Sequence, residues 1–156
     1  LFNANSTYSE TPKIEKVVAD DQKLKRTNKK ILVVDDSAIQ RNRLNSMLTR
    51  AGYKVEVAVD GHDGLKKASG TRFDAFCVDI VMPLMDGYEF VEQIRNTERF
   101  AKAPVFLVTG KNIASGAETR RVQSLNIKRV LEKPVNEAEI LKELDSACHA
   151  SEIVEA

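Results

Sequence analysis

Three acidic residues, a threonine and a lysine stand at points of the sequence where they could do chemistry together. Asp35 and Asp36 follow the apolar run ILVV, and Asp79 follows the run AFCV. Thr109 and Lys133 each follow a later apolar run. Short apolar runs rich in β-branched residues are typical of buried strands. If these strands are parallel, all five side chains meet at the carboxyl edge of one sheet, where open α/β folds bind their ligands.

The three carboxylates predict a bound divalent cation. Acids crowded into one crevice repel each other, so without a counter-charge at least one should have a raised pKa. Oxygen ligands suit Mg²⁺ better than Zn²⁺, which favours His or Cys. We therefore predict that Asp36 and Asp79 are direct Mg²⁺ ligands together with the backbone carbonyl group of Val81, and that Asp35 acts mainly through water.

Asp79 is also a candidate nucleophile. A carboxylate can attack phosphorus and form an acyl phosphate if the charge on the transferred oxygens is neutralised. We expect Mg²⁺, the ammonium group of Lys133 and the hydroxyl group of Thr109 to supply that neutralisation. Each residue alone has an ordinary explanation, such as a helix cap for Asp35 or Asp36. Their joint occurrence after four strands favours the chemical interpretation.

Short apolar runs alternate with amphipathic segments from Lys30 onward, which is typical of a parallel sheet covered by helices. This pattern predicts five strands and five helices with right-handed crossovers, in the strand order 2-1-3-4-5 of a flavodoxin-like three-layer α/β sandwich. The expected strands are Ile31–Val34, Val55–Val59, Ala75–Val78, Val105–Val108 and Arg129–Leu131. After the first helix, the others should begin near Gly61, Tyr88, Gly116 and Glu137.

The expected helices also carry end signals. Three candidate caps each stand three residues before a Gln or Glu: Ser37, Ser115 and Asn136. Gly52 is the expected stop of the first helix. The predicted apolar side of that helix consists of Ile39, Leu44, Met47, Leu48 and Ala51.

Length, charge and cysteine content limit the class of protein. The 156 residues suit one domain, and a formal net charge of +1 gives no overall basic field for nucleic-acid binding. No apolar run approaches the roughly 18 residues of a spanning helix, so a membrane partner is not expected. Cys77 and Cys148 match no metal or redox spacing, which favours a reducing, cytoplasmic setting.

The two ends of the sequence differ from its middle. Residues 1–29 combine scattered apolar residues with many charges, so we expect a linker or disordered tail with a short helix near Ile14 to Leu24. The basic cluster from Lys23 to Lys30 is interpreted as solvated linker rather than a nucleic-acid patch. The globular domain should occupy residues 30–150, followed by a tail over 151–156. Because residue 1 is Leu, we expect the chain to be part of a larger protein.

These features together resemble the receiver domain of two-component response regulators, the CheY-like fold. The likeness covers about Lys29 to Ala150 and rests on ILVVDDS (31–37), DIVMPLMDG (79–87), VTG (108–110) and EKP (132–134). It implies that Asp79 accepts a phosphoryl group from a sensor histidine kinase or a histidine phosphotransfer domain. It also implies that Thr109 and Lys133 sense the phosphate and that the Lys133–Pro134 peptide bond is cis. The DDS opening and the segment DGHDGL look most like receivers fused to, or working with, chemotaxis-type histidine kinases.

The sequence departs from the family at the position three residues before the lysine, where Val130 replaces the usual Tyr or Phe. The rotating aromatic ring associated with activation is therefore absent. Two further residues bear on the lifetime of the phosphoryl group. We expect the Val81 side chain to crowd the path of an attacking water. We expect Lys111 to offer that water hydrogen-bond donors but no acceptor.

Two other functions compete with this interpretation. A haloacid dehalogenase-type phosphatase also uses a strand-end Asp, a second Asp, a Thr or Ser and a Lys with Mg²⁺. Its first two acids are separated by one residue, whereas Asp35 and Asp36 are adjacent, and this sequence has no cap domain. A pseudo-receiver would keep the fold as an interaction module without the chemistry. The complete set of residues favours a receiver that catalyses only its own Mg²⁺-dependent phosphorylation and dephosphorylation.

Overall fold

The computed structural model describes residues 5–110 and 116–149, with backbone alone for residues 5–14 and 19. In these ranges, five parallel strands form one sheet in the order β2-β1-β3-β4-β5, as predicted. Their bounds agree with the expected ones to within one residue at each end. The strands are β1 Lys30–Val34, β2 Lys54–Ala58, β3 Ala75–Asp79, β4 Val105–Thr109 and β5 Arg129–Glu132.

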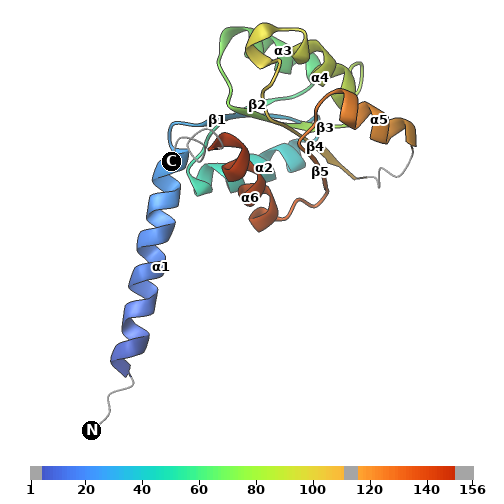
Figure 1. Cartoon of the computed structure of the whole chain (residues 1–156). Coiled ribbons are helices and arrows are strands. Elements are labelled where there is room, and N and C mark those ends of the chain that lie inside the picture. The colour runs from blue at the N-terminus through green and yellow to red at the C-terminus, as the bar shows by residue number, and fades with distance from the viewer. Residues whose placement is uncertain (1–4, 111–115, 150–156) are drawn as a thin grey trace.

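Within the described residues, five helices alternate with the strands, and a further helix precedes them. The helices are α1 Asn5–Arg26, α2 Ala38–Ala51, α3 Gly61–Gly70, α4 Gly87–Arg95, α5 Gly116–Ser124 and α6 Glu137–Cys148, with the 3-10 helix η1 Glu98–Phe100. Helices α2 and α6 cover one face of the sheet, and α3, α4 and α5 cover the other (Figure 1). No helix of the described residues is long and apolar enough to cross a membrane.

Helix ends follow the predicted signals where the structure describes them. The Ser37 side chain accepts a hydrogen bond from the Gln40 N–H at 3.4 Å, and the Asn136 side chain accepts one from the Glu139 N–H at 2.9 Å. Gly52 ends α2 with φ of 114°, a left-handed conformation that favours glycine. The predicted cap Ser115 lies outside the described residues.

One residue of the predicted apolar side of α2 was placed wrongly. Leu44, Met47 and Leu48 are buried, but Ile39 is 78% exposed. Ile39 and Leu48 are nine residues apart, which is two and a half turns at about 3.6 residues per turn. The two side chains therefore point to opposite sides of the helix.

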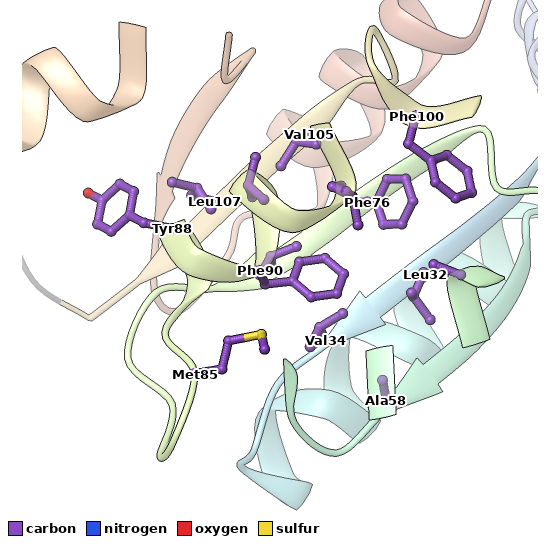
Figure 2. Close-up of a cluster of buried hydrophobic side chains, with 14 of the residues drawn as sticks. Leu32, Val34, Ala58, Phe76, Met85, Tyr88, Phe90, Phe100, Val105 and Leu107 are labelled. Atoms are coloured by element: carbon purple, nitrogen blue, oxygen red, sulfur yellow. The ribbon is translucent and has the colours of Figure 1, made fainter. Parts of the chain in front are cut away.

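The core consists of two clusters, one on each face of the sheet. On the α3–α4 face, Phe76 of β3 packs edge-on against Phe100, with ring centroids 5.0 Å apart, and lies beside Phe90 of α4 (Figure 2). On the other face, Leu44, Met47 and Leu48 of α2 meet Ile140 and Leu144 of α6. Burying such side chains is worth about 1.5–3 kcal/mol each before the cost of ordering them. The strand ends are thus held rigidly by packing on both faces.

The N-terminal segment differs from the expected linker with a short helix. The structure has one continuous helix, α1, over Asn5–Arg26, which projects from the sheet with its C-terminal end beside β1 (Figure 1). The C-terminal end of this helix is attached to the rest of the chain at Arg26, which is only 8% exposed. Contacts made by this side chain fix the last turn, from which the helix extends. The domain boundaries given above remain a prediction.

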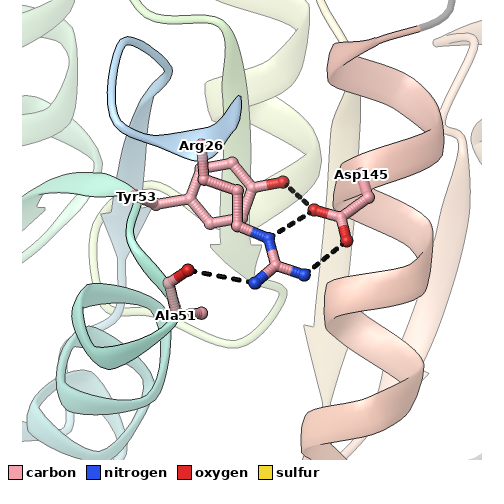
Figure 3. Close-up of polar contacts among 4 residues, drawn as sticks. All are labelled: Arg26, Ala51, Tyr53 and Asp145. Carbon is pink, nitrogen blue, oxygen red and sulfur yellow. Dashed lines mark hydrogen bonds and ion pairs between the residues drawn. The ribbon is translucent and has the colours of Figure 1, made fainter. Parts of the chain in front are cut away.

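Arg26 joins three elements through its guanidinium group (Figure 3). Nε and Nη2 donate to the two carboxylate oxygens of Asp145 in α6, at 2.8 and 2.6 Å, and Nη1 donates to the Ala51 carbonyl group of α2 at 3.0 Å. The Tyr53 hydroxyl group donates to the same carboxylate at 2.5 Å. Forked arginine–carboxylate pairs of this kind are among the stronger polar contacts in proteins.

Candidate functional site

The predicted site residues meet at the carboxyl edge of the sheet. Asp35 and Asp36 follow β1, Asp79 and Thr109 end β3 and β4, and Lys133 follows β5. Parallel pairing sets Asp79 opposite Val108 and Thr109 opposite Glu132, so these ends lie at one level. Of the four buried polar or charged residues in the described chain, three belong to this site: Asp35, Asp79 and Thr109. Burying polar groups is costly unless they are paired, which points to function.

Lys133 provides the positive charge of the site. Its Nζ lies 3.2 Å from Asp35 Oδ2 and 3.2 Å from Asp79 Oδ1. Its N–H group donates to the Thr109 carbonyl group at 2.7 Å, and its peptide bond to Pro134 is cis, as the family resemblance implied. The ammonium group is thus positioned by its backbone as well as by its ion pairs.

The three carboxylates fit a divalent cation. Asp35, Asp36 and Asp79 each offer one oxygen, and these oxygens all lie within 4.8 Å of one another. Asp35 already uses both of its oxygens, because Oδ1 accepts the Ser37 N–H at 2.8 Å and Oδ2 pairs with Lys133. Asp36 is exposed and free of such contacts within the described residues. The Asp36 oxygens are thus available to a cation, whereas those of Asp35 are engaged, and the direct role of Asp36 and the indirect role of Asp35 stay predictions.

Crowding of the acids changes the charge state of Asp79. Burial, together with the negative charge of Asp35, raises the pKa of Asp79 to about 6, although the ammonium group of Lys133 acts in the opposite direction. The raised pKa is the one expected when acids share a crevice without a cation. A bound cation would favour the ionised form, which is also the nucleophilic one.

The loop after β3 carries features that sequence reasoning missed. Asp86 caps α4 by accepting the Glu89 N–H at 2.8 Å, and Gly87 donates its N–H to the Ile80 carbonyl group at 2.8 Å. Helix α4 therefore begins directly against the strand that carries Asp79. The Asp-Gly pair before a helical segment was the available signal. Val81 lies in this loop with its side chain 56% exposed.

Val130 occupies the position where the family usually has an aromatic residue, and its neighbours include Tyr88. Val130 is half-buried on β5 and packs against the cluster that contains Tyr88 of α4. Tyr88 is buried, and within the described part of the chain its hydroxyl oxygen has no hydrogen-bond partner. The Arg121 guanidinium group of α5 lies 4.4 Å from the centre of its ring. Sequence reasoning identified Tyr88 only as the start of a helix and not as a neighbour of Val130. Lys111 lies outside the described residues.

Comparisons with known proteins agree on one family. The model of the response regulator receiver domain matches residues 31–145. Chemotaxis protein CheY of Treponema pallidum is 35% identical over 131 residues, covering 78% of this chain and 91% of that protein. Some other relatives are longer proteins, of which this chain spans 52% and 34%.

Solved structures give the same result. Chemotaxis protein CheY4 of Vibrio cholerae is 34% identical with a TM-score of 0.71, covering 76% of this chain and 98% of that one. The receiver domain of sensor histidine kinase PA1611 from Pseudomonas aeruginosa is 28% identical with a TM-score of 0.69, covering 77% of this chain and 97% of that one. That structure has a magnesium ion coordinated in its active site cleft.

Proposed function

The chain belongs to the response regulator receiver domain family, and on this basis we propose that Asp79 accepts a phosphoryl group from a histidine kinase or a histidine phosphotransfer domain. The observation that carries the proposal is the 3.2 Å contact between Asp79 Oδ1 and Lys133 Nζ in a buried site. A buried strand-end carboxylate held beside a fixed ammonium group is placed both to attack phosphorus and to have its product stabilised.

In the transfer, a carboxylate oxygen of Asp79 forms a bond to phosphorus while the bond from phosphorus to the donor imidazole nitrogen breaks. The electron pair of that bond leaves with the imidazole, which takes up a proton. Lys133 neutralises charge on the phosphoryl oxygens, and it is held within reach by its cis peptide bond and its backbone contact to Thr109. The Thr109 hydroxyl group, at the end of the neighbouring strand, is proposed to bond a phosphoryl oxygen.

The residues fit Mg²⁺, because three carboxylates offer oxygens within 4.8 Å of one another and the described cluster contains no nitrogen or sulfur ligand. We propose that Asp36, Asp79 and the Val81 carbonyl group hold the ion directly and that Asp35 holds it through water. When bound, the ion supplies positive charge that lowers the repulsion between the carboxylates and the incoming phosphoryl oxygens.

The proposal makes the chain a stoichiometric acceptor rather than an enzyme acting on outside substrates. Its only catalysis would be its own phosphorylation and dephosphorylation. A cytoplasmic setting is part of the proposal, supported by two free, buried cysteines, Cys77 and Cys148.

A turnover assay separates this function from the phosphatase alternative. With Mg²⁺ and an excess of p-nitrophenyl phosphate, an acceptor releases no more than about one equivalent of product within a phosphoryl lifetime, since the group stays on Asp79. With acetyl phosphate, the intact protein should gain one phosphoryl group. Sustained release of nitrophenol over many equivalents would favour the phosphatase.

Because Val130 lacks a ring, we propose that the signal leaves the site through the loop after Thr109 and the start of α5. Helix α5 has no buried residue of its own, and its contacts with the core include Arg121 over Tyr88. A helix without buried residues can shift at a low cost in free energy when the neighbouring loop moves.

A further inference from the structure

The two edges of the sheet differ sharply in charge. At the amino edge, the connections that enter the strands, together with the first residue of each strand, carry eight basic residues and two acidic ones. The basic residues are Lys29, Lys30, Lys54, Arg72, Arg99, Lys102, Lys128 and Arg129, and the acidic ones are Asp74 and Glu98. The acids of the phosphoacceptor site lie at the opposite edge. Arg129 pairs with Glu139 and Glu143, and Lys30 pairs with Glu56, so the positive charge that the proposed function does not use belongs to the other six basic residues.

Part of this charge lines a crevice of about 420 Å³ at the start of β1, β2 and β3. Its lining consists of Asn28, Lys29, Lys30, Lys54, Arg72 and Asp74. The basic cluster read from the sequence supplies Lys29 and Lys30, whereas the fold adds Lys54 and Arg72 from two other connections. Residues more than 40 positions apart in the chain thus share one concave surface.

The charges of the crevice are only partly balanced. The Asp74 carboxylate accepts the Lys30 N–H at 2.8 Å, and the Lys30 ammonium group pairs with Glu56 at 3.0 Å. Lys29, Lys54 and Arg72 have no ion-pair partner among the described residues. Three cations in one crevice repel each other, so a bound anion would lower the energy of this arrangement.

Helix ends do not explain this convergence. The carboxyl ends of helices favour basic residues, which accounts for Arg50 and Arg95 in the last turns of α2 and α4. Lys29, Lys54 and Arg72 lie two or three residues beyond the ends of α1, α2 and α3, outside the last helical turn in which the dipole acts most strongly. Their position in a shared crevice points to a ligand rather than to compensation of helix dipoles.

We propose that this crevice binds a small anionic ligand through its phosphate groups. Arginine presents a planar fork that matches phosphate oxygens, and the lysines add point charges. Phe73 and Tyr53, the aromatic residues next to Arg72 and Lys54 in the chain, are only 3% and 2% exposed, so neither ring is open for stacking a base. The ligand is therefore recognised by its phosphates, and the volume suits a small molecule.

The position of the crevice gives the ligand a defined effect. Lys29 lies in the short connection between α1 and β1, whereas Lys54 and Arg72 belong to the body of the domain. An anion shared by all three would tie the end of α1 to the sheet, at the edge opposite Asp79. Anion binding in the crevice would thus regulate the attachment of α1 independently of phosphorylation at Asp79.

Inorganic tripolyphosphate is the probe for a first test, in Mg²⁺-free buffer with a chelator, by calorimetry and amide NMR on the full chain. We expect saturable binding with shifts confined to residues 28–30, 54 and 72–74. Affinity should fall at least about tenfold in Lys54→Gln/Arg72→Gln, which loses two charge-assisted contacts. Lys102→Gln/Lys128→Gln is the matched control, because it removes two exposed cations that line a separate pocket of about 440 Å³ at the same edge. Its affinity should change by less than about twofold if the crevice is specific.

Absence of saturable binding at millimolar tripolyphosphate, or equal weakening in the two double variants, would overturn the proposal. The Asp79→Asn variant should bind as the native chain does, and loss of binding there would place the anion at the wrong edge. Sedimentation with phosphatidylcholine vesicles containing phosphatidic acid identifies the source. Binding that is lost in Lys54→Gln/Arg72→Gln assigns a lipid headgroup, whereas tripolyphosphate binding without vesicle binding assigns a free phosphate ligand.

Discussion

A β-carbon at Gly87 would lie 2.4 Å from the main-chain carbonyl oxygen of Asp79. It would also lie 2.9 Å from the α-carbon of Ile80. Both neighbours are backbone atoms at the end of β3, so neither can move aside as a flexible side chain would. The first turn of α4 is therefore packed directly on the strand that carries the proposed acceptor.

Gly87→Ala should disturb the site and the fold together. We expect a loss of about 1–3 kcal/mol in the free energy of unfolding, because the added methyl group overpacks a rigid backbone contact. Urea denaturation measures this loss, and acetyl phosphate labelling should slow in the same variant. Gly70→Ala is the control, since among the described residues no atom outside its own helix backbone and chain neighbours lies within 4 Å of a β-carbon there. Equal stability of the two variants would show that the close approach has no energetic weight.

Arg26→Ala tests the attachment of α1. We expect the free energy of unfolding to fall by about 2 kcal/mol, because the change removes a forked, charge-assisted contact while Asp145 remains partly solvated. Arg50→Ala breaks an ion pair to Glu137 whose side chains are 70% and 49% exposed, so its effect should stay within about 0.5 kcal/mol. Chemical denaturation of both variants decides the matter. If Arg26→Ala were as mild as Arg50→Ala, the contacts in Figure 3 would not stabilise the chain.

The same cluster predicts a pH dependence. Burial alone would raise the pKa of Asp145, but hydrogen bonds from Arg26 and Tyr53 and the charge of Arg26 outweigh it and hold the pKa below its ordinary value. A depressed pKa contributes stability that is complete above the unfolded value of about 3.9 and is lost as pH falls through the folded value. The stability difference between the native chain and Asp145→Asn should therefore be constant near neutral pH and shrink below about pH 4. A stability difference that grew toward low pH would contradict a lowered pKa of Asp145 in the folded chain.

Val81 should limit how fast the phosphoryl group is lost. Hydrolysis of the acyl phosphate needs a water in line with the bond to Asp79, and an apolar side chain two residues away cannot hold one. Val81 is 56% exposed, so a polar replacement should not disturb the core. After removal of the donor, Val81→Asn and Val81→Glu should release phosphate faster than the native chain. Unchanged rates in both variants would show that Val81 does not control water access.

The site was predictable because its residues sit where parallel strands end. Strand periodicity places Asp79 and Thr109 at one edge of the sheet, and five short apolar runs are enough to locate that edge. Arg26 was not predictable in this way. Its burial depends on Asp145, which is 119 residues away, and no local pattern pairs the two. The crevice formed by Lys29, Lys54 and Arg72 is likewise a product of sheet register.

The ligand roles proposed within the acidic cluster also depend on contacts that no local pattern contains. Spacing identifies Asp35 and Asp36 as neighbours, but only the structure shows that Asp35 is occupied by Ser37 and Lys133. Ile39 was assigned to the core from its apolar character, but an apolar residue near a helix start need not face the core. Contacts set by tertiary packing were thus the part that sequence alone could not provide.

The central claim is that Asp79 is the phosphoacceptor in a Mg²⁺-dependent transfer. Its most direct test is the intact mass of the native chain and of Asp79→Asn after incubation with acetyl phosphate, with Mg²⁺ and with excess chelator. We predict one added phosphoryl group on the native chain with Mg²⁺ and none in chelator. We also predict none on Asp79→Asn, because an amide is neither nucleophile nor anionic ligand. Undiminished labelling of Asp79→Asn would contradict the account and move the acceptor to another residue.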